Sequence, residues 1–277
     1  MTDVVAGRGI GAAEAEVRAA LAFLTRIPAA TGARTRGART PRDVGIHAAT
    51  TGAAAFGLVG ALVGAAAAAA VVLVGGAAPF PGAVLAVGGV AVLSGGLHLD
   101  GLADTADALA VGDPDRAETA RRDPRVGAAG AAAIATIVML DAAVVASLIA
   151  GDGAEFAAAS CIVAGAGSRA FAALTPLLAR GRVRSDGSAA WFARGVTPVA
   201  TSVALGSALV LGLGFAVVVG NAALVVGLVA ALAIAGCIVE LLIRLRGALD
   251  GDGIGAAVEL SFATILLVVL TLSSPRA

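Results

Sequence analysis

Long apolar runs separated by short polar connections dominate the pattern of this chain. A membrane-spanning helix needs about 20 mostly apolar residues. Seven segments approach that length and composition, and the second is the shortest, running directly into His98 and Asp100. The segments are 48–74, 83–99, 128–150, 156–178, 198–219, 222–243 and 254–273. The pattern predicts an all-α, polytopic membrane helical bundle of about six or seven transmembrane helices, forming one integral membrane domain over residues 1–277.

Composition strengthens this interpretation. Hydrophobic residues make up 59% of the chain and charged residues 14%, and the mean hydropathy is +0.97. Soluble domains are usually about half apolar and a quarter charged. The excess of apolar side chains is what a lipid bilayer would cover, and the net charge of zero gives no reason to expect a nucleic-acid partner. Cys161 and Cys237 lie in apolar runs and are expected to be buried thiols.

The distribution of arginine predicts the orientation in the membrane. Arg residues concentrate in 1–47, 100–127, 179–197 and 244–253, and the connections between these regions (75–82, 151–155 and 220–221) contain none. Positive charge is retained on the cytoplasmic side. We therefore expect a multi-pass plasma-membrane protein whose N-terminus and long loops are cytoplasmic and whose C-terminus is outside.

The N-terminal segment 1–47 is expected to be cytoplasmic or interfacial. Within it, Val17, Leu21 and Leu24 recur at nearly helical spacing between Ala12 and Ile27. Such a stripe predicts a helix that lies in the membrane interface or re-enters the membrane.

The densest chemistry lies in segment 98–127, which we expect to be a cytoplasmic acidic active-site segment. Asp100, Asp104 and Asp107 are spaced i, i+4, i+7, so a helix would place all three on one face. Carboxylates that close repel one another, and Mg²⁺ prefers carboxylate oxygens while leaving positions for phosphate. The alternative is a solvated acidic helix start, although Asp107 lies beyond the first turn. His98 is a candidate ligand, base or interface residue.

Two arginines are candidates for further roles. Arg125 follows Pro124 in a turn before the third span, and its planar guanidinium suits phosphate oxygens. Arg169 lies inside the fourth span, where an unpaired charge is costly. It is expected either to bind substrate or to pair with Asp141 or Glu240.

A glycine-rich acidic loop, Gly251-Asp-Gly-Ile-Gly-Ala256, precedes the last span. Asp250 and Asp252 are candidates for further metal ligands, or the loop is a flexible turn. The Lys and Ser/Thr of a Walker loop are absent, and the ligand spacing of an EF-hand is not met.

Taken in order, five motifs resemble those of the adenosylcobinamide-GDP ribazoletransferase (cobalamin synthase) family. They are Phe23-Leu-Thr-Arg-Ile-Pro28, Gly95-Gly-Leu-His-Leu-Asp-Gly-Leu-Ala-Asp-Thr-Ala-Asp107, Asp123-Pro-Arg-Val-Gly-Ala-Ala-Gly130, Ser168-Arg169 and Gly251-Asp-Gly-Ile-Gly-Ala256. They span nearly the whole chain. Two positions depart from the family pattern, with Ala108 where Gly is common and Asp250 where Thr is common.

The resemblance implies a Mg²⁺-dependent membrane enzyme that acts in the last steps of cobalamin biosynthesis. It would join adenosylcobinamide-GDP to α-ribazole, or to α-ribazole 5′-phosphate, and release GMP. It leaves homo-oligomer formation and association with other enzymes of the pathway open. The implied catalytic and metal-binding residues are Asp100, Asp104 and Asp107, and the implied substrate-binding residues are His98, Asp123, Arg125, Arg169 and Asp252.

Two other functions compete with this interpretation. A CDP-alcohol phosphotransferase places Arg shortly after its Asp-Gly pair, whereas no Arg follows Asp100-Gly101 here until Arg116. A membrane transporter would use intramembrane charges such as Asp141 and Glu259, usually with internal repeats. The chain shows no repeat, and its densest polar cluster lies at the end of a span.

Overall fold

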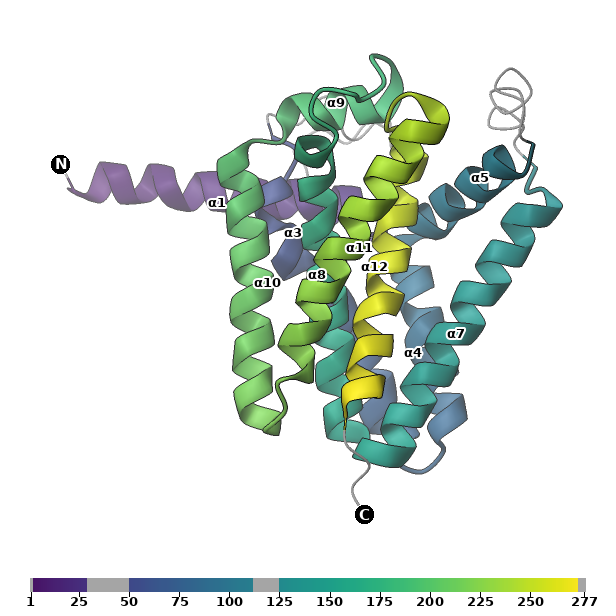
Figure 1. Ribbon diagram of the computed structural model, residues 1–277. Helices are drawn as coiled ribbons and strands as arrows, with labels where there is room; N and C mark the ends of the chain where they lie inside the picture. Colours follow the sequence, from purple (N-terminus) through teal and green to yellow (C-terminus); the bar gives the residue numbers. More distant parts are fainter. Residues whose placement is uncertain (1, 29–49, 112–124, 274–277) are drawn as a thin grey trace.

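The computed structural model describes residues 2–28, 50–111 and 125–273, with side chains described from residue 11 onward (Figure 1). Helices account for nearly all of this part of the chain, and its only β feature is an isolated bridge between Val183 and Leu249. The all-α prediction is confirmed. The elements are α1 (Thr2–Leu24), η1 (Ala53–Ala55), α3 (Phe56–Ala70), η2 (Val71–Gly75), α4 (Pro79–Ser94), α5 (Leu97–Val111), α7 (Ala128–Asp152), α8 (Ala154–Leu178), α9 (Gly187–Gly195), α10 (Pro198–Val219), α11 (Ala223–Arg246) and α12 (Gly251–Leu272).

Six helical segments in the described residues are long and apolar enough to cross a membrane, and a bent pair, α4 with α5, makes a seventh when counted as one span. They follow the predicted segments closely, and α10 spans the predicted residues 198–219. The prediction of a polytopic membrane bundle with six or seven spans is confirmed.

The second predicted span, 83–99, is wrong in its extent. Helix α4 begins earlier, at Pro79, and ends at Ser94, and α5 leaves it at an angle of 90°. Gly95 and Gly96 form the break with φ of 62° and 71°, a left-handed conformation that favours glycine. Asp100 therefore lies on a separate helix that turns across the end of the bundle, and not on the continuation of a span.

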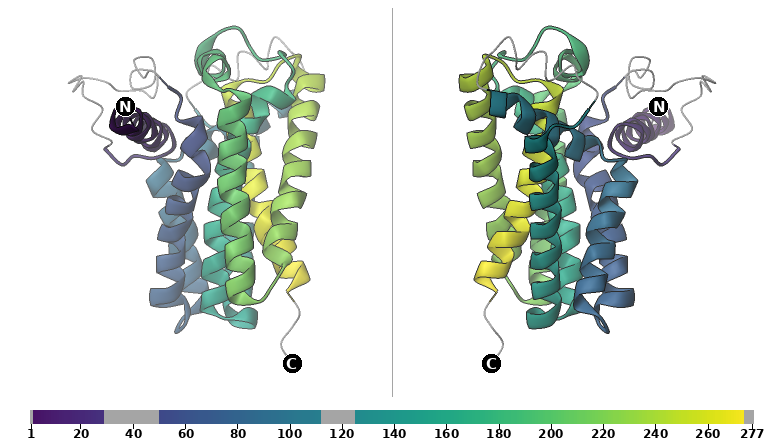
Figure 2. Two further views of the ribbon diagram at one scale, coloured as in Figure 1. Left: turned by 90° about the vertical axis from the view of Figure 1, so that its left-hand side faces the viewer. Right: turned by 90° about the vertical axis from the view of Figure 1, so that its right-hand side faces the viewer.

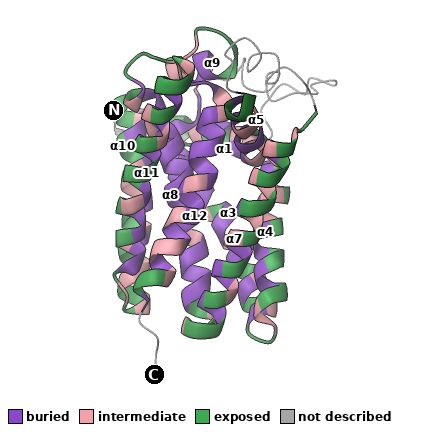
Figure 3. Cartoon of the chain, turned by 45° about the vertical axis from the view of Figure 1, so that its right-hand side comes forward, coloured by how far each residue is buried: buried purple, intermediate pink, exposed green. Residues whose placement is uncertain are grey.

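Helix α8 forms the centre of the bundle, and α10 lies at its edge (Figure 3). In the apolar stretch of α8, 78% of the residues are buried, whereas in that of α10 only 17% are buried. The exposed side chains of α10 include Val210 and Val217. Helices α3 and α8 approach closely through Gly60 and Gly165, where a β-carbon would collide with the facing backbone. Small residues at such crossings are the usual means of packing helices in lipid.

One end of the bundle carries α1, α5, α9 and the start of α12, and α12 finishes at the other end (Figures 1 and 2). Helix α1 lies across the axis of the bundle at this end and begins earlier than the predicted Ala12. Its place in the membrane interface stays a prediction.

Two loops at this end are bonded together. The Arg184 amide donates to the Leu249 carbonyl at 2.9 Å, and the Leu249 amide donates to the Arg182 carbonyl at 2.8 Å. Asp250 then accepts from Gly253 N–H at 2.9 Å, capping α12, and pairs with Arg246 at 2.6 Å. The start of α12 is thus held beside the segment that leads into α9.

Candidate active site

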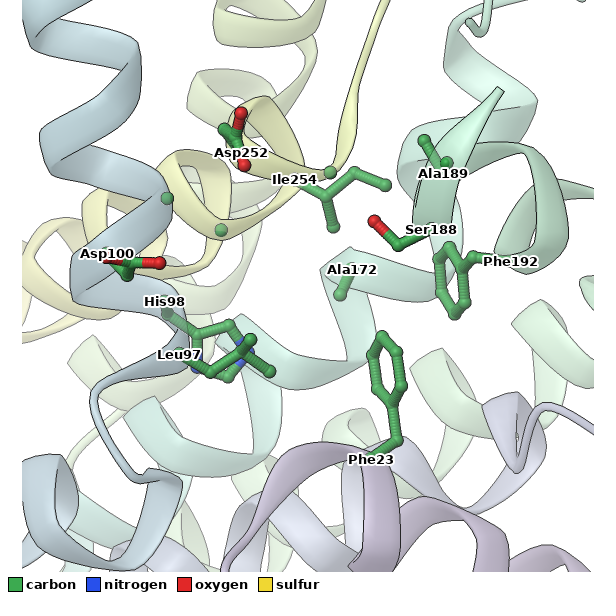
Figure 4. Close-up of a pocket in the computed structure, with 14 residues that line it drawn as sticks. Phe23, Leu97, His98, Asp100, Ala172, Ser188, Ala189, Phe192, Asp252 and Ile254 are labelled. Atoms are coloured by element: carbon green, nitrogen blue, oxygen red, sulfur yellow. The ribbon is translucent and has the colours of Figure 1, made fainter. Parts of the chain in front are cut away.

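A cavity of about 400 Å³ opens among α1, α5, α8, α9 and α12 at this end of the bundle (Figure 4). Its size is in the range of small-molecule sites. The polar side chains that line it are His98, Asp100, Ser188 and Asp252. Its other lining residues are glycine or apolar: Phe23, Leu97, Gly101, Ala172, Gly187, Ala189, Phe192, Gly251, Ile254 and Gly255.

Two carboxylates share this cavity because α5 and α12 pack backbone against backbone. A β-carbon on Gly101 would lie 2.8 Å from the Asp252 carbonyl oxygen, and one on Gly255 would lie 3.2 Å from the Gly101 α-carbon. Larger residues at either position would push the helices apart. The glycines next to Asp100 and Asp252 therefore bring two acidic motifs, far apart in the sequence, to one site.

His98 occupies the inner end of the acidic side. The residue is 3% exposed, and its Nδ1 has no hydrogen-bond partner among the described residues. Buried polar atoms are nearly always paired, so this unpartnered nitrogen is an exception beside the cavity that the residue lines.

Asp107 has a different setting from Asp100. Its carboxylate accepts hydrogen bonds from the backbone amides of Gly127 and Gly130, at 2.7 and 2.8 Å, so it caps the N-terminus of α7. A β-carbon at either glycine would collide with this carboxylate. Gly127 and Gly130 thus leave room for the Asp107 carboxylate at the start of α7.

Two of the remaining predicted residues, Asp104 and Arg125, are described and do not line the cavity. Asp104 is half-buried on α5, one turn beyond Asp100, and Arg125 is exposed just before α7. Asp123 lies outside the described residues. Their predicted roles stay predictions, and the site assembled here consists of His98, Asp100 and Asp252.

Arg169 is buried in the interior of the bundle, where it is 1% exposed and does not line the cavity. It donates to Ser168 Oγ at 2.9 Å, lies over the Phe262 ring at 5.5 Å, and interacts electrostatically with Glu259 and Asp141.

Of the two partners predicted for Arg169, Asp141 interacts with it electrostatically, although less strongly than Glu259 does. Glu240 is wrong as the partner, because it is bonded elsewhere, accepting from Arg182 at 3.0 Å and from Arg244 at 2.8 Å.

The two carboxylates of the cavity, Asp100 and Asp252, can hold a magnesium ion if substrate phosphates and water complete its coordination. No group of three His, Cys, Asp or Glu side chains converges as a ligand set within residues 11–28, 50–111 and 125–273. Mg²⁺ is commonly held by one or two carboxylates together with waters and substrate phosphates, and Asp100 and Asp252 supply two. No Arg is among the described lining residues, so a phosphate here would face carboxylates and would need a cation.

Comparison with known proteins decides the family. A family profile described as Cobalamin-5-phosphate synthase matches residues 16–270. A protein of Citrobacter koseri named adenosylcobinamide-GDP ribazoletransferase is 35% identical over 256 residues, covering 91% of this chain and 98% of its own length. Proteins of the same name from Pseudomonas paraeruginosa and Shigella dysenteriae are 32% and 33% identical, covering 90% and 91% of this chain and 95% and 98% of their own lengths. No solved structure matches the chain.

This chain belongs to the cobalamin-5-phosphate synthase family. The matched residues include every lining residue of the cavity and all of the described spans except the last two residues of α12. Family membership does not favour a CDP-alcohol phosphotransferase or a transporter.

Several lining residues of this family member were not predicted from the sequence. Ser188, Ala189 and Phe192 come from α9, a short helix in a segment notable in the sequence only for its arginines. Phe23 comes from the N-terminal motif that carried the resemblance. A signal for both existed, because aromatic residues are scarce in this chain and Trp191-Phe192 falls in a polar connection.

Proposed function

We propose that this protein transfers the adenosylcobinamide-phosphate group of adenosylcobinamide-GDP to α-ribazole or its 5′-phosphate, releasing GMP. The observation that carries the proposal is the family match over residues 16–270 together with one cavity that gathers the acidic and histidine motifs. The product would be adenosylcobalamin or its 5′-phosphate, so the protein would act at the end of cobalamin biosynthesis.

The reaction would proceed by attack of a ribose hydroxyl oxygen of α-ribazole on the phosphorus that stays with cobinamide. The bond between that phosphorus and the oxygen bridging to GMP breaks, GMP leaves with the electron pair, and the hydroxyl loses its proton. A group on the cavity wall would accept this proton, and Asp100, Asp252 and His98 are the titratable side chains there. In-line positioning of the two substrates supplies a further part of the rate.

We assign the metal site to Asp100 and Asp252, with Asp104 one turn away on the same helix face as Asp100. Mg²⁺ bound there would neutralise charge on the diphosphate as the bond to GMP breaks. The hydrogen bonds that the Asp107 carboxylate accepts from the backbone amides of α7 favour a structural role for that residue. Arg125 and Asp123 remain candidates for contacts with the departing GMP.

The end of the bundle that carries the cavity would face the cytoplasm of a cell whose plasma membrane holds the protein. Arg180, Arg182, Arg184, Arg244 and Arg246 lie in or beside the loops at this end, which suits the cytoplasmic bias of positive charge. Both nucleotide substrates would then be reached from the cytoplasm.

The test is the reaction itself, run with purified protein in lipid vesicles, adenosylcobinamide-GDP, α-ribazole and Mg²⁺, with GMP and cobalamin measured. Asp100→Asn and Asp252→Asn are compared with Glu155→Gln, an exposed carboxylate at the opposite end of the bundle. We expect both cavity variants to lose at least a hundredfold in kcat and the control to match the wild type. A wild type that is folded and releases no GMP would contradict the proposed reaction.

The assignment of Mg²⁺ to Asp100 and Asp252 is tested separately, by the Mg²⁺ dependence of the rate and by Mg²⁺ binding. Both Asp variants should also need more Mg²⁺ for half-maximal rate, and isothermal titration of Mg²⁺ with a non-reacting diphosphate should show weaker binding. If these variants keep wild-type rates while the wild type is active, the reaction stands and the metal site is elsewhere.

A further inference from the structure

The motif at the end of α1 has no role in the chemistry proposed above, although it reaches the cavity. Phe23 stacks on Phe192 with ring centroids 5.4 Å apart and planes 2° from parallel, and on Phe56 at 5.7 Å. Trp191 lies 6.0 Å from Phe23. The chain contains eight Phe and one Trp, and three of the Phe and the Trp gather at this point. Phe56 and Phe192 are almost fully buried, so the cluster packs this end of the bundle and also forms part of the cavity wall through Phe23 and Phe192.

The cavity is polar on one side and apolar on the other. Figure 4 shows Asp100 and Asp252 on one side, and Phe23 and Phe192 on the opposite side. Asp100 is exposed at the mouth, whereas Phe192 is 1% exposed. A ligand that fills the cavity therefore has a charged or metal-bound end near the carboxylates and a flat apolar end against the rings.

We propose that this aromatic end binds the base of α-ribazole. The inference rests on the proposed function and assigns one substrate to one part of the site. The base is a benzimidazole whose outer edge carries two methyl groups, so it is flat and needs few hydrogen-bond partners there. Aromatic side chains bind such bases by stacking and apolar contact. With the base at Phe23, the ribose extends towards His98, where the hydroxyl must lose its proton.

The other substrate groups fit this end less well. Guanine carries a carbonyl, an amino group and a ring N–H on its edge, and Ser188 Oγ is the only polar side-chain atom that the described lining offers on the aromatic side. Burying the remaining polar atoms without partners is unfavourable. The corrin ring is several times larger than a nucleoside base and exceeds a cavity of about 400 Å³. These groups are expected nearer the open, acidic side.

The experiment measures binding of α-ribazole alone to the full chain in lipid nanodiscs by isothermal titration, followed by steady-state kinetics with each substrate varied. The variants are Phe23→Leu, which removes the ring, and Phe23→Trp, which keeps an aromatic face. Phe156→Leu is the matched control, since Phe156 is a buried Phe in the first turn of α8 and does not line the cavity. Thermal unfolding checks that all three variants fold.

We expect Phe23→Leu to raise the Kd and KM for α-ribazole by roughly tenfold to a hundredfold. The KM for adenosylcobinamide-GDP should stay within about twofold, and Phe23→Trp and Phe156→Leu should bind α-ribazole like the wild type. Guanosine should not compete with α-ribazole in the titration.

Three results would overturn the assignment. An active enzyme whose Kd for α-ribazole is unchanged by Phe23→Leu leaves the reaction intact and places the base elsewhere. A selective loss of affinity for adenosylcobinamide-GDP, with competition by guanosine, makes the aromatic end a guanine site. A folded wild type that neither binds α-ribazole nor releases GMP removes the proposed function together with this subsite.

Discussion

Replacing Asp107 tests whether this residue is a metal ligand or a cap of helix α7. The sequence groups Asp107 with Asp100 and Asp104 as a metal ligand, whereas in the structure both of its oxygens accept amides at the start of α7. Asp107→Asn preserves shape and one carboxamide oxygen, but it removes the charge and one acceptor. Loss of a helix N-cap destabilises a protein by about 0.5–2 kcal/mol, and the interaction of the charge with the helix dipole contributes a further 0.3–1 kcal/mol or so.

We therefore expect Asp107→Asn to lower the free energy of unfolding by about 1–2 kcal/mol, measured by reversible unfolding in mixed detergent micelles. The cavity walls come from α1, α5, α8, α9 and α12, and not from α7, so the fold around Asp100 should persist. The kcat for GMP release should fall by less than tenfold, and the Mg²⁺ concentration for half-maximal rate should not change.

Asp100→Asn is measured in the same assays for comparison. Asp100 lines the cavity, and its side chain caps no helix among the described residues. The reasoning is refuted if Asp107→Asn retains wild-type stability but loses activity by a thousandfold with a raised Mg²⁺ requirement. In that event Asp107 holds the metal, as its spacing alone predicts, and its bonds to α7 are secondary.

Three further predictions use other features of the bundle. Gly255→Ala should reduce stability by about 1–3 kcal/mol and reduce kcat, because the new methyl overpacks the contact with α5, whereas Gly236→Ala, which has open space, should do neither. Arg169→Met should lower the unfolding free energy by about 3–5 kcal/mol by leaving buried carboxylates uncompensated. Adding Asp141→Asn and Glu259→Gln should recover most of that loss, and full stability of the single variant would contradict a charge cluster. Alkaline phosphatase fused after Ala277 should be active, and green fluorescent protein fused there should not fluoresce, because the C-terminus is expected outside the cell. The reverse result would contradict a cytoplasmic N-terminus with seven spans.

The spans could be predicted from sequence because lipid imposes a simple requirement of length and apolarity. Every spanning segment must satisfy its own backbone hydrogen bonds, so long apolar runs become helices whatever surrounds them. The end of the second span could not be placed by that rule. Leu97 and Leu99 continue the apolar run past Gly95, and the bend depends on a backbone conformation that hydropathy does not encode.

The acidic side of the site was predicted in part, and the aromatic side was not. Asp100 stands out because carboxylates at helical spacing at the end of an apolar run are unfavourable without a cation. Asp252 was a candidate, but its nearness to Asp100 depends on Gly101 and Gly255, whose contact joins segments about 150 residues apart in the sequence. The scarcity of aromatic residues singles out Phe23 and Phe192 in the sequence, but only the packing of α1 against α9 shows that the two rings meet.

The bend between α4 and α5 accounts for why an acidic helix can follow an apolar span directly. Continued straight, the helix would carry Asp100 away from α12 and would lack the contact between Gly101 and Gly255. Turned by 90°, it lies across the end of the bundle, where Asp100 avoids the cost of lipid and shares the cavity with Asp252. The backbone amide of Arg26 donates to the Leu93 carbonyl at 2.7 Å, and the Arg26 side chain packs over Gly95. The motif that contributes Phe23 to the cavity therefore also contacts the bend that leads to Asp100, so one segment links the apolar half of the site to the helix that carries its acidic half.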